Sequence, residues 1–171
     1  MRDLGLLVLR GTVGGLLAGH GAQKLFGAFE GPGMQGTTGM MEAMSLHPGR
    51  PWAMLAGGTE FVGGVLTAVG LGGGLGPITV LGPMGMAIGT AHWGKPIWAS
   101  KGGAELPITN VAVATALILA GPGRFSLDEA LGIDVPRPLI GLALAGALAG
   151  VVFGVSRRFK RAPGPPAGGG G

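Results

Sequence analysis

The chain has 171 residues, of which 47% are hydrophobic and only 12% are charged. A soluble domain carries roughly 25% charged residues, so this composition excludes an ordinary soluble enzyme and indicates an integral membrane protein. The chain contains no cysteine, which excludes disulfides, a thiol nucleophile and cysteine-ligated metal centres within it.

The positive charge of the chain does not point to nucleic acid. The net charge is +4, and much of the excess comes from four residues that directly follow an apolar run: Arg157, Arg158, Lys160 and Arg161. Beside a membrane span, such a cluster binds anionic lipid headgroups and marks the cytoplasmic side. We therefore expect the lipid bilayer as a partner and no nucleic acid.

The first apolar segment, residues 4–26, is long enough to cross a bilayer but carries several polar side chains. A bilayer core of about 30 Å needs about 20 mainly apolar residues in a helix. Polar side chains inside such a span are costly, so they normally face other helices or a wet cavity and are candidates for function. Here they are Arg10, His20, Gln23 and Lys24. Lys24 also suits a snorkelling role at the end of the span.

Further apolar segments predict four more membrane spans, at residues 52–71, 75–98, 107–120 and 138–155. The loop after the first span is expected to carry a short amphipathic surface helix at residues 37–45. After the fourth span, Ser126 and Glu129 form an S-x-x-E capping box, which predicts the start of a short interfacial helix.

The predicted spans divide the chain into three parts. Residues 1–128 would form a transmembrane four-helix bundle, and residues 129–156 an interfacial segment and a fifth transmembrane helix. Residues 157–171 would form a basic and then Pro/Gly-rich tail with the composition of a disordered segment. The predicted fold class is therefore all-α, a membrane four-helix bundle with an additional C-terminal helix.

Small residues recur at four-residue spacing in most of the predicted spans. Such ridges let two helices approach closely, so they predict packing faces. The ridges are Gly11, Gly15 and Gly19; Gly85 and Gly89; Ala112, Ala116 and Ala120; and Gly146, Gly150 and Gly154.

Three ionisable side chains from three predicted spans are expected at one depth. His20, Glu60 and His92 each lie some five to eight residues inside a span, or about 8–12 Å at 1.5 Å per residue. Glu105 is expected at the mouth of this layer, and Arg10 lies deeper. If the helices form a bundle, these groups converge in a polar pocket. The competing interpretation is that Glu60 pairs with a neighbouring cation only to fix the order of the helices.

A metal or haem site is the less favoured use of the two histidines. His20 and His92 could ligate a haem iron axially, but two imidazoles and one carboxylate form a sparse ligand set. We therefore expect no metal site and assign no cofactor with certainty. A quinone remains the preferred small-molecule ligand.

Four stretches form a combined pattern: HGAQKLFG at 20–27, GGTEFVGGVLTAVGL at 57–71, AHWGK at 91–95 and GPGRFSLDE at 121–129. Together they resemble the DoxX family of small bacterial membrane proteins. The resemblance implies a four-helix membrane bundle with an oxidoreductase-related function. Some relatives are membrane subunits of thiosulfate:quinone oxidoreductases, and actinobacterial members are associated with redox defence against thiol stress. The fifth predicted span departs from the four-helix pattern of the family.

The favoured function is a DoxX-like, multi-pass subunit of a redox system in the cell membrane, which binds a quinone or a small oxidisable molecule. Either a redox partner protein or electrons from the substrate are expected, because the chain shows no electron carrier of its own. Two alternatives remain, a non-enzymatic scaffold for a partner enzyme and a small-molecule transporter. The candidate catalytic residues are His20, Glu60 and His92, and the candidate substrate-binding residues are Arg10, Gln23, Lys24 and Glu105.

Overall fold

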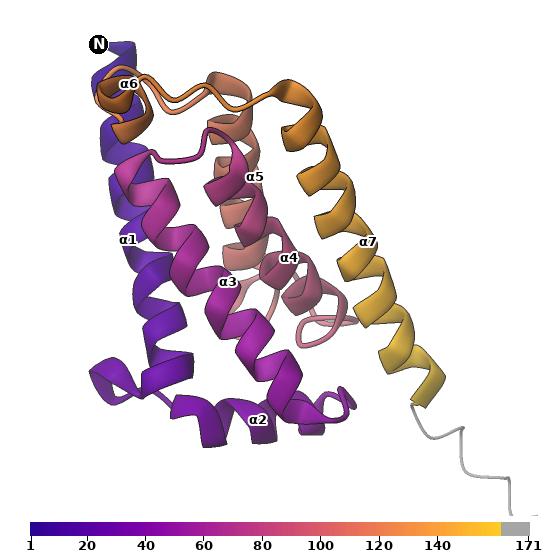
Figure 1. Cartoon of the computed structure of the whole chain (residues 1–171). Coiled ribbons are helices and arrows are strands. Elements are labelled where there is room, and N and C mark those ends of the chain that lie inside the picture. Colours follow the sequence, from indigo (N-terminus) through magenta and orange to yellow (C-terminus); the bar gives the residue numbers. More distant parts are fainter. Residues whose placement is uncertain (162–171) are drawn as a thin grey trace, which may run out of the picture.

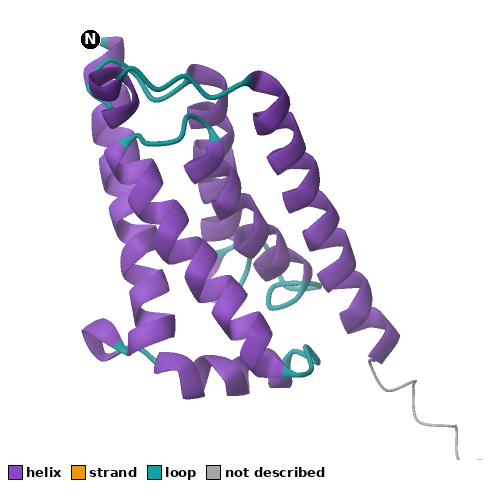
Figure 2. Ribbon diagram, viewed as in Figure 1, coloured by secondary structure: helices purple, strands orange, loops and turns teal. Residues whose placement is uncertain are grey.

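The computed structural model describes residues 1–161, with side chains up to Arg157. The described residues form helices and no strand, which confirms the all-α class (Figures 1 and 2). Of the predicted tail, residues 157–171, the first five belong to the helix α7, and the rest lie outside the described residues. The α-helices are α1 (Arg2–Phe26), α2 (Gly33–Ala43), α3 (Gly49–Val69), α4 (Leu75–Gly89), α5 (Glu105–Ala120), α6 (Leu127–Leu131) and α7 (Arg137–Arg161), with short 3-10 turns η1 (Ala28–Glu30) and η2 (Ala99–Lys101).

Three of these helices are long and apolar enough to cross a membrane: α1, α3 and the Arg137–Arg157 part of α7. The helices α4 and α5 are apolar but shorter, about 22–24 Å at 1.5 Å per residue. Figure 1 shows both running alongside α1 and α3, with α7 as an outer helix. Length and composition therefore support three of the five predicted crossings.

The contact between α1 and α3 is made by glycines that leave no room for a side chain. A Cβ added to Gly14 would lie 2.6 Å from the carbonyl oxygen of Gly64, and one added to Gly21 would lie 2.7 Å from that of Gly57. Both helices repeat their glycine after seven residues, which is the spacing of two helices that wrap around each other with a left-handed twist. The two backbones are therefore in direct contact.

The predicted ridge on α1 is wrong. A Cβ at Gly11, Gly15 or Gly19 would meet no atom within 4 Å, so these glycines contact no other helix within residues 1–161. Four-residue spacing occurs on more than one face of a glycine-rich helix, and only the partner helix selects between the faces. Gly14, adjacent to the predicted ridge, is the residue that packs.

The third predicted span ends about nine residues too late. α4 stops at Gly89, and residues 90–98 form turns rather than helix. Pro96 disfavours helical backbone in the residue before it, and Gly94 has a φ of 75°, in the left-handed region. His92 therefore lies in a loop and not inside a span.

The packing predicted for the small-residue ridges on α4, α5 and α7 is confirmed only in part. Gly85 of α4 contacts α7 as expected, since a Cβ there would lie 2.9 Å from the side chain of Val151. Ala112 and Ala116 of α5 are exposed instead of packed. On α7, Gly146 and Gly150 contact no other helix, whereas Gly154 packs against Met86 and Trp52.

The two short surface helices follow the sequence expectations. α2 begins four residues before the predicted surface helix and lies across the ends of α1 and α3 (Figure 1). Thr37 contributes to this contact, because its buried hydroxyl lies 3.1 Å from the carbonyl oxygen of Lys24 and 2.8 Å from that of Gly33 and can donate to either. The capping box is confirmed at the start of α6, where the Ser126 hydroxyl accepts a hydrogen bond from the backbone N–H of Glu129 at 3.2 Å.

The glycine contact gives the first prediction. Gly14→Ala should destabilise the protein by about 1–3 kcal/mol, because the added methyl group must displace the backbone of α3. Its neighbour Gly15 provides the matched control, since a Cβ there meets nothing and Gly15→Ala should leave stability unchanged or slightly raised. Thermal unfolding of both variants in detergent measures the difference. Equal melting temperatures would contradict the assigned contact face.

Candidate functional site

A cavity of about 910 Å³ lies between the helices. This volume is within the usual range for small-molecule sites, about 300–1,000 Å³. Residues of α1, α3, α4 and α5 line it, with α2 and α7 contributing further walls. Most of the lining is apolar, and five of its members are methionines, which adapt readily to the shape of a ligand: Met40, Met41, Met44, Met84 and Met86.

Glu60 is the charged group at the centre of this site. It lies on α3, lines the cavity and is only 2% exposed. One carboxylate oxygen, Oε1, accepts a charge-assisted hydrogen bond from Nζ of Lys24 on α1. The other oxygen, Oε2, is buried and has no hydrogen-bond partner among the described residues. A buried polar atom without a partner is costly, so Oε2 is an unsatisfied acceptor on a side chain that lines the cavity.

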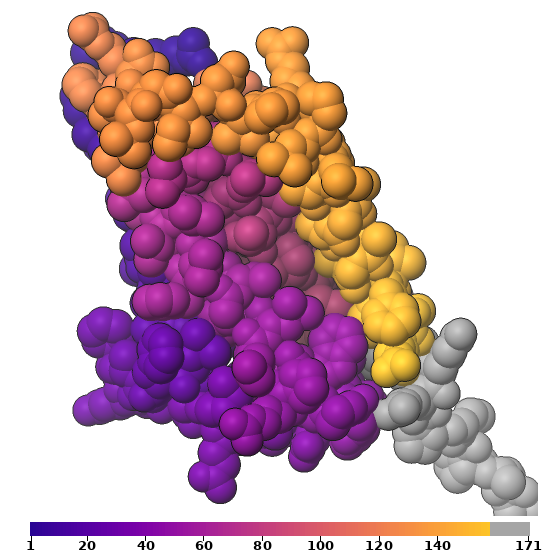
Figure 3. Space-filling model, viewed as in Figure 1, coloured from indigo at the N-terminus to yellow at the C-terminus, as the bar shows by residue number. Residues whose placement is uncertain are grey.

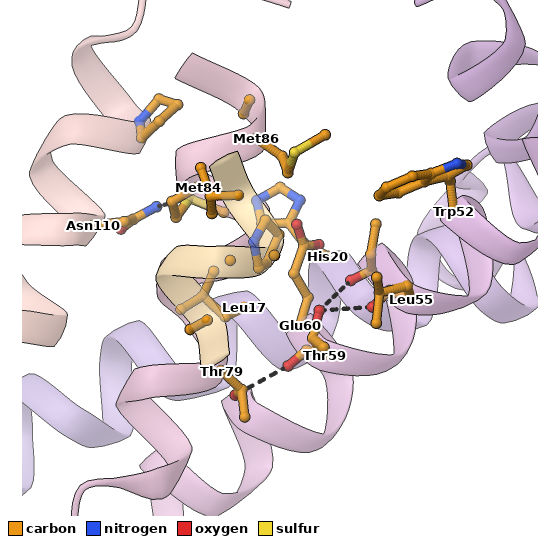
Figure 4. Close-up of a pocket in the computed structure, with 18 of the residues that line it drawn as sticks. Leu17, His20, Trp52, Leu55, Thr59, Glu60, Thr79, Met84, Met86 and Asn110 are labelled. Atoms are coloured by element: carbon orange, nitrogen blue, oxygen red, sulfur yellow. Dashed lines mark hydrogen bonds between the residues drawn. The ribbon is translucent and has the colours of Figure 1, made fainter. Parts of the chain in front are cut away.

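His20 lines the same cavity from α1, and Figure 4 draws it with Glu60 among the lining side chains. Its Nδ1 lies 3.1 Å from Oε1 of Gln23, one turn later on the helix. Gln23 does not line the cavity itself. Its carbonyl oxygen can hold the proton of His20 on Nδ1 and so orients the ring.

His92 also lines the cavity, although it comes from the loop after α4. Its Nδ1 lies 2.7 Å from the carbonyl oxygen of Gly102. A carbonyl oxygen can only accept, so Nδ1 of His92 carries the proton and Nε2 of the neutral ring is an acceptor. The structure thus brings His20, Glu60, Lys24 and His92 to one cavity, although it changes the element that carries His92.

Asn110 was missed by the sequence analysis. It lies on α5 and lines the cavity, where its side-chain amide makes one weak contact of 3.6 Å with the sulfur of Met84. It is the only asparagine of the chain and lies within an apolar span. An amide in such a span was a signal that could have identified it.

Two predicted binding residues lie away from the cavity. Glu105 is exposed at the start of α5, where its Oε2 accepts a hydrogen bond of 2.8 Å from the backbone N–H of Ala99. Arg10 is 2% exposed and does not line the cavity. It donates to the carbonyl oxygens of Ala68 at 3.0 Å, near the end of α3, and of Phe125, just before α6. These contacts tie both side chains to the backbone.

Arg10 belongs to a cluster of buried polar contacts that joins the end of α3 to α6. Asp128, which is 3% exposed, accepts hydrogen bonds from the backbone N–H groups of Gly72 at 2.8 Å and Gly73 at 2.6 Å. Its own backbone N–H donates to the carbonyl oxygen of Gly70 at 3.1 Å. The GPGRFSLDE stretch therefore fixes the turn between α3 and α4 and does not contribute to the cavity.

The donor and acceptor set of the cavity suits proton exchange with an uncharged or weakly polar ligand. It offers a carboxylate oxygen, two imidazoles, an ammonium group and an amide within mainly apolar walls. Among the described residues, no group of three or more His, Asp or Glu side chains is placed to hold a metal ion.

A family model described as DoxX matches residues 5–93, just over half of the chain. The chain belongs to the DoxX family. No curated protein and no solved structure gives a significant match. The DoxX match contains His20, Lys24, Glu60 and His92, whereas α5, α6 and α7 lie beyond it.

The ion pair in the cavity gives the second prediction. Lys24→Met leaves the buried carboxylate of Glu60 without a counterion, which should cost about 3 kcal/mol of stability. This loss of stability is at the lower end of the range for buried ion pairs, because the side chain of Lys24 is still 25% exposed. The double variant Lys24→Met, Glu60→Gln removes both charges and should regain much of the loss.

Melting temperatures in detergent measure this cycle. Lys101→Met is the control, because Lys101 is exposed on η2 and distant in sequence from the pair. Additive losses from the two single substitutions would show that the two charges do not stabilise each other.

Proposed function

We propose that this DoxX protein is a multi-pass membrane subunit of a redox system, which binds a quinone in the cavity around Glu60, His20 and His92. The observation that carries the proposal is the buried, unpartnered Oε2 of Glu60 in a large, mainly apolar cavity. In this arrangement, all five apolar helices cross the cell membrane, and the cavity lies within the bilayer. Membership of the DoxX family supports a role in redox-related membrane systems.

The chemistry of a quinone matches the polar groups of the cavity. Reduction of a quinone takes up two electrons and two protons, and its carbonyl oxygens become hydroxyl groups. Oε2 of Glu60, or the free Nε2 of a neutral imidazole, would accept a hydrogen bond from such a hydroxyl, whereas the Nε2 of a protonated imidazole would donate to a carbonyl oxygen. Glu60 and the histidines would exchange the protons, since proton transfer requires groups within hydrogen-bond reach of the reacting oxygen. The electrons would come from a partner protein.

Lys24 would serve as a positioning residue. Its ammonium group holds Oε1 of Glu60 and leaves Oε2 for the ligand. Gln23 would act in the same way on His20, by fixing the proton on Nδ1. We propose these roles in place of the direct substrate contacts expected from the sequence.

A non-enzymatic scaffold is the second candidate function, because the pairing of Glu60 with Lys24 is also what a purely structural polar core would contain. In that case, removal of Glu60 or His20 would change stability but no ligand affinity. A soluble enzyme that co-purifies equally with both variants would favour the scaffold.

The third prediction tests the quinone site. Glu60→Gln and His20→Ala should each weaken quinone binding by at least about tenfold, the equivalent of one charge-assisted hydrogen bond, and should abolish quinone turnover in native membranes. Glu105→Gln provides the control, because Glu105 lies outside the cavity. Quenching of tryptophan fluorescence in nanodiscs can follow binding, since Trp52 lines the cavity. Unchanged affinity in folded variants would refute the quinone site.

A further inference from the structure

The cavity is much longer than its polar region. On α3, its lining residues run from Trp52 to Leu66, roughly 21 Å at 1.5 Å per residue. The titratable groups belong to its middle and to the end near α2, whereas Leu66 and Leu75 line the far end. A polar headgroup bound at Glu60 would therefore leave an apolar space beside it.

This space lies between α4 and α7. The two helices touch near both of their ends. At one end, a Cβ at Gly74 would lie 3.6 Å from the side chain of Ile140, and at the other a Cβ at Gly85 would lie 2.9 Å from that of Val151. Figure 3 shows a strip of α4 between α3 and the outer helix α7.

Between these contacts, the residues of α7 that line the cavity are small: Ala143, Gly146, Ala147 and Gly150. On the facing side, α4 contributes Gly82 beside the larger Ile78 and Pro83. A Cβ added to any of these three glycines would meet no atom within 4 Å. Small residues on membrane helices normally permit close packing, but here they border an unfilled space. Gly146 and Gly150 are exposed, so the gap is open on its outer side and leaves room for the apolar part of a ligand.

We infer that the groove between α4 and α7 holds the apolar tail of the ligand whose headgroup binds at Glu60, and that the ligand is a long-chain membrane quinone. This inference rests on the proposed function and specifies its substrate class. The headgroup site and the groove form one continuous cavity, so a single amphipathic molecule fills both. The stretch from Ala143 to Gly150 offers about 10 Å of groove for the tail.

The inference also gives α7 a function. This helix lies outside the matched part of the chain, and only 6% of its apolar window is buried. It packs chiefly against α4 and adds little to the core of the bundle. It does, however, supply the outer wall of the groove, where a tail would otherwise be exposed to lipid.

The fourth prediction uses two quinones with the same benzoquinone headgroup, one without a tail and one with a decyl tail. Gly146→Leu should fill the groove and weaken binding of the tailed quinone by at least about tenfold, the equivalent of about two buried methylene groups, while the tail-less quinone binds within about twofold of wild type. Gly82→Leu should do the same from the opposite wall. Gly141→Leu is the matched control, because Gly141 lies on α7 outside the cavity and has no neighbour within 4 Å.

The measurement is the affinity of both quinones for five proteins in nanodiscs, with folding checked by thermal unfolding: wild type, the three glycine variants and Glu60→Gln. If Gly146→Leu and Gly82→Leu bind the tailed quinone as Gly141→Leu does, the tail does not occupy the groove. The proposed function survives that result if Glu60→Gln still weakens both quinones. If wild type binds neither quinone, the proposed function and this inference both fail. In native mass spectrometry, a phospholipid that is bound to wild type and lost from Gly146→Leu would assign the groove to lipid.

Discussion

The direct backbone contact between α1 and α3 is the constraint on which the candidate site depends. A side chain at Gly14 or Gly21 would separate the two helices. The same approach brings Lys24 against α3, where a Cβ at Gly57 would lie 3.2 Å from its Cβ. From there its ammonium group reaches Glu60. Without the glycines, a buried carboxylate on α3 would lack its cation, which would be costly in an apolar interior.

The charged pair and the cavity depend on each other. Lys24 neutralises Glu60 but satisfies only one of its oxygens, so Oε2 stays available. In an apolar environment, a vacant acceptor attracts a donor strongly because no water competes for it. The adaptable methionines around the cavity would let ligands of different shapes reach this atom. A structural ion pair and a ligand site can therefore share one carboxylate, which joins the two interpretations that the sequence had left open.

The two ends of the bundle differ in the partners of their buried charges. At one end, Arg10 and Asp128 use buried charge to tie α3, α4 and α6 together through backbone groups. Near the other end, α2 and the loop that carries His92 border the cavity. Buried charge that binds the backbone holds the fold, whereas buried charge with a vacant acceptor is suited to a ligand.

The sequence by itself determined the membrane character, the helical class, the positions of most helices and the DoxX membership, because these follow from local composition, periodicity and motifs. It also identified His20, Glu60, Lys24 and His92 as candidates, since polar groups in apolar segments are rare for energetic reasons. It could not say which glycine face of α1 packs, because equal spacings on a helix are equivalent until a partner helix is present.

Only the tertiary structure decided which polar residues meet. In the structure, Lys24 pairs with Glu60, Arg10 contacts the end of α3 away from the cavity, and Asn110 lines the cavity. The structure also showed that α7 leaves a gap along α4, which no spacing of small residues could reveal. The reason is physical: a side chain's depth along a helix follows from counting residues, but its partners and the spaces around it depend on how the helices pack.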